Sequence, residues 1–169
     1  FDEVTLKLTL LLTASFYLFF ITFKDLIKKE YKNISQTISH FGFSLLILSI
    51  ILNSFLSKEI ITNLKVGDEI NFQENIIKFK KIESSFSSNY QSLIGHFEIN
   101  NKHLFTPEVR IYDQPEVITS EADIKTNLFK DRFLVINLVK DNDYLNVRYQ
   151  EKPLMIWIWL STILITLNS

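Results

Sequence analysis

The chain has 169 residues, of which 47% are hydrophobic and 22% charged, and its formal net charge is -1. A charge so close to zero, without a basic stripe interleaved with aromatic residues, argues against a nucleic-acid-binding protein. The absence of cysteine excludes disulfides, thiolate metal sites and a cysteine nucleophile, so any redox chemistry needs a cofactor. Apolar residues gather at the two ends and charged residues fill the middle, which predicts a membrane protein with one modest domain outside the bilayer.

The first apolar segment predicts transmembrane helix 1 within residues 1–23. Its one charge between residues 4 and 23 is Lys7, placed where a long side chain can reach the interface, and a helix of this length covers roughly 30 Å. A secretory signal would begin with basic residues rather than Asp2 and Glu3 and would have a shorter apolar run. Residues 24–33 contain more lysines than acidic residues, which predicts a basic inner loop on the cytoplasmic or matrix side.

The second apolar segment, residues 34–56, predicts transmembrane helix 2 and carries His40 near its start. An unpaired polar group in hydrocarbon costs several kcal/mol, so this imidazole must be hydrogen-bonded, bound to a metal or turned towards water. Gly42 beside it would let either a neighbouring helix or a flat ligand approach closely. His40 is therefore the main candidate site residue.

Residues 57–152 predict an outer β-rich domain. Because the basic loop lies on the inner side, the second span returns the chain to the outer side. A turn at residues 65–68 puts Gly67 where a positive φ is needed. Alternating apolar and polar residues predict half-buried strands at residues 69–72, 76–82, 93–99, 133–139 and 144–149. We expect a small antiparallel sandwich or barrel, interrupted by a helical or irregular stretch at residues 119–129.

Residues 153–169 predict a C-terminal transmembrane helix, with Trp157 and Trp159 near its start, where indoles favour the membrane interface. About fourteen apolar residues is short for a span, so this helix is either truncated or supported by a thicker neighbour. The predicted fold class is a membrane protein with two to three transmembrane α-helices and a small antiparallel β-rich extramembrane domain.

Six short motifs occur in an order that is similar to the C-terminal portion of the CcmF-type cytochrome c haem lyase of cytochrome c maturation system I. They are HFGF at 40–43, LKVGD at 64–68, PEVRIY at 107–112, SEADI at 120–124, LFKDRFLV at 128–135 and VRYQEKPLMIWIW at 147–159. The likeness runs from residue 39 to residue 159. The chain thus resembles the last third of that lyase, in a fragment or a split mitochondrial form.

The resemblance implies a role in attaching haem to the two thiols of a Cys-x-x-Cys-His segment of apocytochrome c. The histidine of the family's His-x-Gly motif is one axial ligand of an intramembrane haem b, and by position it falls on His40. Phe41 and Phe43 would supply apolar flanks for the porphyrin, and imidazole is the usual axial ligand of such a haem. The alternative for His40 is a helix histidine that is hydrogen-bonded to a neighbouring serine, threonine or carbonyl.

In the family, the second axial histidine and the tryptophan-rich WWD segment lie in the earlier part. The resemblance therefore implies that this chain shares the haem with a partner chain and that the catalytic haem-binding segment is on that partner, so enzyme activity of this chain alone stays open. The glycine-rich final helix of the family is replaced here by residues 160–164.

Two further functions remain as alternatives. The chain could be a non-catalytic structural subunit of a larger respiratory membrane complex derived from such a lyase, or a generic membrane-anchored binding domain. For the lyase, the implied partners are its remaining part, the haem chaperone, apocytochrome c and respiratory complex subunits. The implied location is the mitochondrial inner membrane or bacterial plasma membrane, with the β domain on the intermembrane-space or periplasmic side.

Other polar residues of the middle segment are weaker candidates. His96 and His103 lack a third ligand at zinc-like spacing, and Glu121 with Asp123 is better explained by a solvated or capping role than by acid–base chemistry.

Two arginines and two tyrosines of the middle segment allow two interpretations. They form either a patch that binds a polypeptide partner or two exposed strand faces. The first is considered because arginine and tyrosine are favoured at interfaces. The four residues are Arg110, Tyr112, Arg148 and Tyr149.

Overall fold

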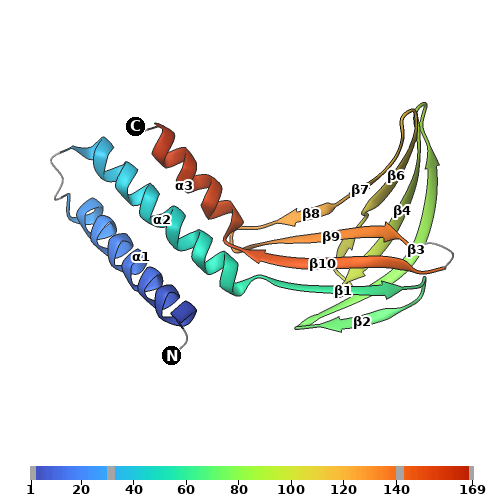
Figure 1. Ribbon diagram of the computed structural model, residues 1–169, viewed down its shortest axis with the longest axis horizontal. Coiled ribbons are helices and arrows are strands. Elements are labelled where there is room, and N and C mark those ends of the chain that lie inside the picture. The colour runs from blue at the N-terminus through green and yellow to red at the C-terminus, as the bar shows by residue number, and fades with distance from the viewer. Residues whose placement is uncertain (1–2, 30–32, 140–142, 168–169) are drawn as a thin grey trace. The chain divides into compact units, whose positions relative to one another are not determined.

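The computed structural model describes residues 3–29, 33–139 and 143–167. Within these ranges the chain forms three helices and ten strands (Figure 1). It divides into two compact units. The helical unit comprises Phe1–Ser57, Thr126–Asp131 and Lys152–Ser169, and the β unit comprises Lys58–Lys125 and Arg132–Glu151.

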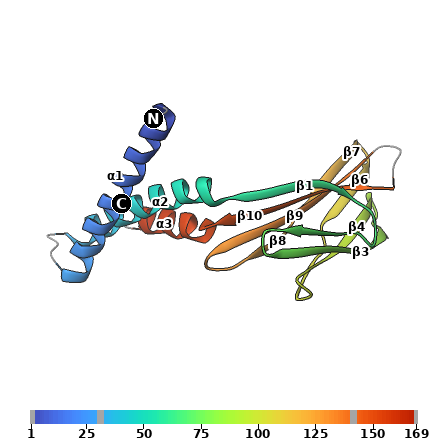
Figure 2. The ribbon, with the colours of Figure 1, turned by 90° about the horizontal axis from the view of Figure 1, so that it is seen from below.

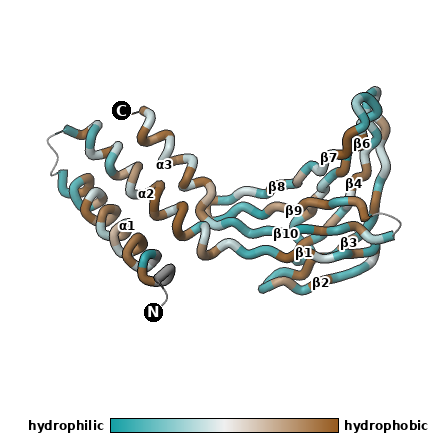
Figure 3. Tube along the Cα trace, viewed as in Figure 1, coloured by the Kyte–Doolittle hydropathy of each residue, from teal (hydrophilic) through white to brown (hydrophobic). Residues whose placement is uncertain are grey.

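The helical unit contains α1 (Glu3–Lys28), α2 (Ile34–Leu56) and α3 (Met155–Leu167). Helix α2 packs against both α1 and α3, and it runs alongside α3 in both views (Figures 1 and 2). Hydrophobic residues occur along all three helices (Figure 3). Two stretches, Thr9–Lys28 and Ile34–Leu56, are long and apolar enough to cross a membrane, whereas α3 is a shorter apolar helix.

The ends of the first two helices show how far the sequence predicted them. Residues 24–28, expected in the inner loop, continue α1 instead, and residues 30–32 lie outside the described residues. No glycine or proline stops the helix at residue 24, and α1 ends beside Lys29, which has a φ of 56°. Helix α2 has the predicted bounds because Asn33 caps it: its side chain accepts hydrogen bonds from the N–H groups of Ser35 and Gln36.

The β unit is built from two antiparallel sheets. The four-stranded sheet has the order β1 (Lys58–Leu64), β10 (Leu145–Pro153), β9 (Lys130–Leu138), β8 (Asp123–Thr126). The six-stranded sheet has the order β2 (Glu69–Phe72), β3 (Asn75–Phe86), β4 (Tyr90–Ile99), β6 (Glu108–Asp113), β7 (Glu116–Glu121), and β5 (His103–Phe105) pairs with β4. Two separate sheets make this a sandwich rather than a barrel.

The core of the sandwich is formed by alternate residues of both sheets. Phe79 and Phe97 stack with their ring centroids 4.4 Å apart, and they share a buried cluster with Leu134, Ile136 and Val147. Because side chains alternate across a strand, the same strands expose a polar face. The period-two pattern therefore predicted these strands correctly.

The predicted helical or irregular interruption at residues 119–129 is wrong. This stretch contains the end of β7, all of β8 and the turn into β9. β7 is an edge strand whose residues are mostly exposed on both faces, so it lacks the alternation of a half-buried strand. Strands β1 and β5 were also not predicted, and β6 was expected only as one alternative for Arg110 and Tyr112. Gly67 does occupy a turn with a φ of 99°, as predicted.

Candidate functional site

His40 lies in the second turn of α2, and its side chain is exposed. Its Nε2 is 3.4 Å from Nε2 of Gln36, one helical turn earlier. A contact of this length is weak. The sequence alternative proposed a serine, threonine or carbonyl partner, whereas the structure places a glutamine amide there. Helical spacing of four residues is the signal that could have identified Gln36.

The other sides of α2 are occupied by the neighbouring helices. Ser44 Oγ lies 3.1 Å from Thr22 Oγ1 of α1, and Gly42 faces α3. His40 shares a different face with Phe43 and Ile50, three and ten residues along, and both of these side chains are exposed. His40 therefore stands on a mostly apolar helix face that is open to another chain or to a ligand.

Gly42 allows close packing between helices. A Cβ on Gly42 would lie 3.1 Å from Leu164 Cβ and Ile165 Cγ1, and 3.2 Å from the Ser161 carbonyl oxygen. Of the two expectations for this glycine, a neighbouring helix or a flat ligand, the structure shows the helix.

Phe41 is not a neighbour of His40 on this open face. Its ring packs against Phe19 and Phe23 of α1, at centroid distances of 5.5 and 6.1 Å. These three rings and residues of α2 and α3 line an apolar groove of about 400 Å³. Only Phe43 of the two expected flanking phenylalanines therefore shares the face of His40, and the groove is a separate feature with no titratable side chain in its lining.

The two remaining histidines lie on strands of the β unit. His96 Nε2 is 2.9 Å from Glu83 Oε2, and Lys81 also pairs with this carboxylate. The hydrogen bond from Lys81, followed by the one from His96, lowers the pKa of Glu83. Across the described ranges no three His, Asp or Glu residues gather closely enough to hold a metal ion, and neither His96 nor His103 forms part of such a group.

Glu121 and Asp123 have separate local partners. Asp123 Oδ2 accepts a hydrogen bond from the N–H of Thr106 at 2.7 Å, and its other oxygen pairs with Lys125 at 3.2 Å. Glu121 accepts a hydrogen bond from the Thr119 hydroxyl at 3.3 Å. These contacts fit a structural role for both carboxylates.

The four-residue docking patch is only partly brought together. Arg110 and Tyr112 share one strand face with Tyr90, whose ring lies 5.2 Å from that of Tyr112 and 5.1 Å from Arg110 Cζ. Arg148 lies in the other sheet, where it pairs with Glu59.

Tyr149 is fully buried, with 0% of its surface exposed, so its expected place in a docking patch is wrong. Alternate residues of β10 face the core, and Tyr149 falls on the inward set. Tyr90 was missed, although its position directly opposite Tyr112 follows from the strand register.

Arg110 is held in place by a carboxylate on its own strand. Its Nε and Nη2 donate to the two oxygens of Glu108 at 3.0 and 3.2 Å. This pair lowers the pKa of Glu108 and raises the pKa of Arg110. The Tyr90–Arg110–Tyr112 face is therefore a preorganised cationic and aromatic surface.

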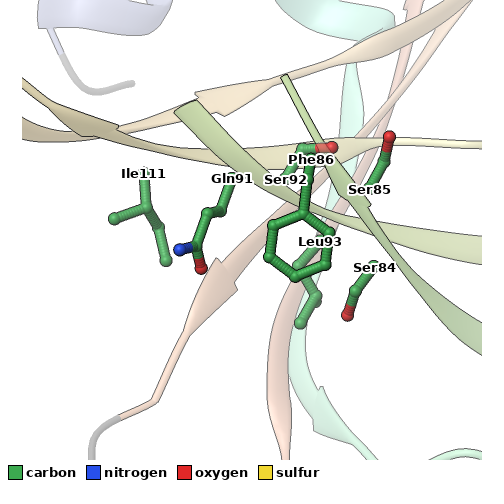
Figure 4. A pocket seen from close by; sticks show the side chains of 7 residues that line it. All are labelled: Ser84, Ser85, Phe86, Gln91, Ser92, Leu93 and Ile111. Carbon is green, nitrogen blue, oxygen red and sulfur yellow. The ribbon is translucent and has the colours of Figure 1, made fainter. Parts of the chain in front are cut away.

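A small hollow lies on the β unit around the β3–β4 hairpin (Figure 4). Its volume is about 90 Å³, and Phe86, Leu93 and Ile111 supply its apolar lining beside serine and glutamine side chains. The space suits one small side chain and is far below the few hundred Å³ of a typical ligand site.

Comparison with known proteins identifies the sandwich. The family model described as "CcmF C-terminal beta-sandwich" matches residues 55–153. A solved structure described as "Cytochrome c Heme Lyase CcmF" is similar to this chain with a TM-score of 0.66 and 15% identity, covering 80% of this chain and 23% of that one. The similarity at this identity shows a shared fold, and the chain spans about a quarter of that protein's length. No curated protein sequence matches.

Proposed function

The chain belongs to the CcmF C-terminal β-sandwich family, and we propose that it is the C-terminal part of a cytochrome c haem lyase that takes part in attaching haem to apocytochrome c. The observation that carries this proposal is the family match, which spans nearly the whole β unit. The two apolar helices, each long enough to cross a membrane, agree with a membrane-bound assembly.

Within this proposal His40 would ligate an intramembrane haem b, which would supply redox chemistry when bound. Three features of the chain suit the role. The imidazole is exposed, its helix face carries apolar neighbours, and its 3.4 Å approach to Gln36 is a weak contact that a metal ion can replace. A neutral imidazole is the form that binds iron.

The second axial ligand would come from a partner chain. The sequence contains three histidines, and the other two lie on β4 and β5 of the β unit. The proposed partners are the remaining part of the lyase, the haem chaperone and apocytochrome c. The proposed location is a mitochondrial inner membrane or bacterial plasma membrane, with the β unit on the intermembrane-space or periplasmic side and the thioether chemistry on the partner chain.

The test is the absorbance of the complex purified from its native membrane. We expect His40→Ala to remove a b-type haem spectrum, while His103→Ala, on β5, keeps it. An unchanged spectrum in the His40→Ala complex contradicts the ligand assignment.

Copurification distinguishes the lyase from a structural subunit of a respiratory complex. The lyase predicts a partner chain with a tryptophan-rich WWD segment and flanking histidines. Purification with respiratory subunits alone supports the structural role instead.

A further inference from the structure

The turn between β8 and β9 exposes two large apolar side chains, those of Leu128 and Phe129. Asn127 Oδ1 accepts hydrogen bonds from the N–H groups of Phe129 and Lys130 at 2.9 and 2.8 Å, and Asn127 N–H donates to the Lys130 carbonyl at 3.2 Å. This is a tight, internally bonded turn. Of these two side chains, 58% of Leu128 and 75% of Phe129 are exposed, so the turn presents two adjacent large apolar side chains on the surface.

The same turn is fastened to the first turn of α3. Trp157 Nε1 donates to the Leu128 carbonyl at 2.8 Å, and the N–H of Leu154 donates to the Phe129 carbonyl, also at 2.8 Å. Both exposed residues therefore have their backbones tied to the start of the helix, and all of these groups belong to the helical unit.

The backbone conformation of Leu154 indicates that the junction between the β8–β9 turn and α3 has a fixed geometry. Its φ of 61° lies in the left-handed region, which a bulky residue adopts at a cost and keeps only where its surroundings impose it. Its carbonyl accepts hydrogen bonds from Trp157 and Ile158 while its N–H is held by Phe129. The turn and the helix start thus form one rigid corner.

This corner lies where the C-terminal end of α2 meets the N-terminal end of α3. Asn53, in the last turn of α2, donates from its side-chain amide to the Pro153 carbonyl just before α3. Helix α2 ends at Leu56 and α3 begins at Met155, so the C-terminal end of one helix and the N-terminal end of the other meet here. Tryptophan side chains favour the membrane interface, and Trp157 lies at this level.

We propose that the β8–β9 turn is a membrane-interface anchor, in which Leu128 and Phe129 insert into the boundary between headgroups and acyl chains beside the start of α3. The occupant of this exposed apolar tip is lipid. The reason is that the tip is hydrogen-bonded to the N-terminal end of the apolar helix α3 through Trp157, a residue type that favours the membrane interface. Lys130 directly follows Phe129 in the sequence, as basic residues commonly flank apolar insertions. The anchor is independent of haem handling.

The full chain offers a direct test because it contains no cysteine. A single cysteine at Phe129 (Phe129→Cys) can carry an environment-sensitive fluorophore in vesicles of phosphatidylcholine and phosphatidylglycerol that contain no other protein. Two matched positions serve as references. Phe86 is equally exposed, at 74%, on the β3–β4 hairpin, and Ile163 is an exposed residue in α3.

We expect nitroxide lipids to quench the label at residue 129 at least about twofold more than the label at residue 86, and nearly as much as the label at residue 163, as for a group 5–10 Å deep in the interface. Aqueous iodide should show the reverse order. Circular dichroism confirms that each labelled chain is folded.

Equal iodide quenching at residues 129 and 86 overturns the proposal. A blue-shifted label at residue 129 that nitroxide lipids do not quench also overturns it, because the tip would then be covered by protein. Neither result bears on the haem lyase assignment, which His40 tests separately.

Discussion

Gly42 of α2 faces the carbonyl oxygen of Ser161 of α3, and a Cβ on Gly42 would lie 3.2 Å from that oxygen. The contact is tight because two further atoms of α3 lie 3.1 Å from the same point. Small residues at such positions let helix backbones approach closely in a membrane. The α2–α3 pair therefore depends on the absence of a side chain at residue 42.

Gly42→Leu should separate α2 from α3. Overpacking of this kind costs about 1–3 kcal/mol, so we expect a lower midpoint for thermal unfolding in detergent, followed by tryptophan fluorescence because both tryptophans lie in α3. Ile50→Phe adds volume on the exposed face of α2 and should leave the midpoint nearly unchanged. An equal loss in both variants would contradict the close contact.

Gly95 has the same role inside the sandwich. A Cβ there would lie 2.7 Å from Cε2 of Phe97 and 3.2 Å from Cδ1 of Ile136, and both of those side chains are fully buried. Gly95→Ala should therefore destabilise the β unit by about 1–3 kcal/mol, measured as faster hydrogen exchange of β4 amides. Ser85→Ala is the control, because Ser85 is an exposed residue of the neighbouring strand β3 and its change creates no contact with the core. Unchanged exchange in Gly95→Ala would show that the core has room.

The sequence predicted the parts of the fold in which one face is buried. Strand β4 alternates between the Phe97 core and solvent, so period-two reasoning found it. Edge strand β7 has both faces largely exposed, and nothing in a single-strand pattern reports which neighbour it will pair with. Long-range pairing is therefore the part of the sandwich that local patterns missed.

The same limit applies to the candidate site. His40 was identifiable because a lone imidazole in an apolar segment demands a partner. Phe41 was misplaced because successive residues of a helix point about 100° apart, which turns it towards Phe19 and Phe23. Tyr149 was misplaced because one residue along a strand separates an exposed Arg148 from a buried tyrosine.

The Glu108–Arg110 pair predicts an acid-sensitive β unit. Arg110 lowers the pKa of Glu108 below its ordinary value of 4.5, so the folded state binds fewer protons than the unfolded state near that pH. The contribution of the pair to the free energy of unfolding is fully present above pH 4.5, and it is lost as the pH falls through the lower pKa of Glu108 in the folded state. Glu108→Gln should flatten this part of the pH profile of urea unfolding. Arg110→Lys, which keeps the charge without the two-donor fork, should give an intermediate profile.

Tyr149 predicts the opposite behaviour at high pH. Burial, followed by its hydrogen bond to Glu151, raises the pKa of Tyr149 well above its ordinary value of 10.0. The hydroxyl donates to Glu151 Oε1 at 2.9 Å, and Asn75 donates to the same oxygen at 3.0 Å. Ionised Tyr149 would therefore face a carboxylate inside the sandwich, so the folded state keeps the proton where the unfolded chain releases it.

The contribution of Tyr149 to the free energy of unfolding should be constant below pH 10.0. It should fall as the pH rises from the pKa of Tyr149 in the unfolded chain to its higher pKa in the folded chain. Tyr149→Phe should remove this alkaline dependence and cost about 1 kcal/mol at neutral pH for the lost hydrogen bond. A difference titration of tyrosinate absorbance between the native chain and Tyr149→Phe isolates one of the six tyrosines. If that difference rises at pH 10.0 rather than above it, the hydroxyl is reached by water and the buried Tyr149–Glu151 contact does not form.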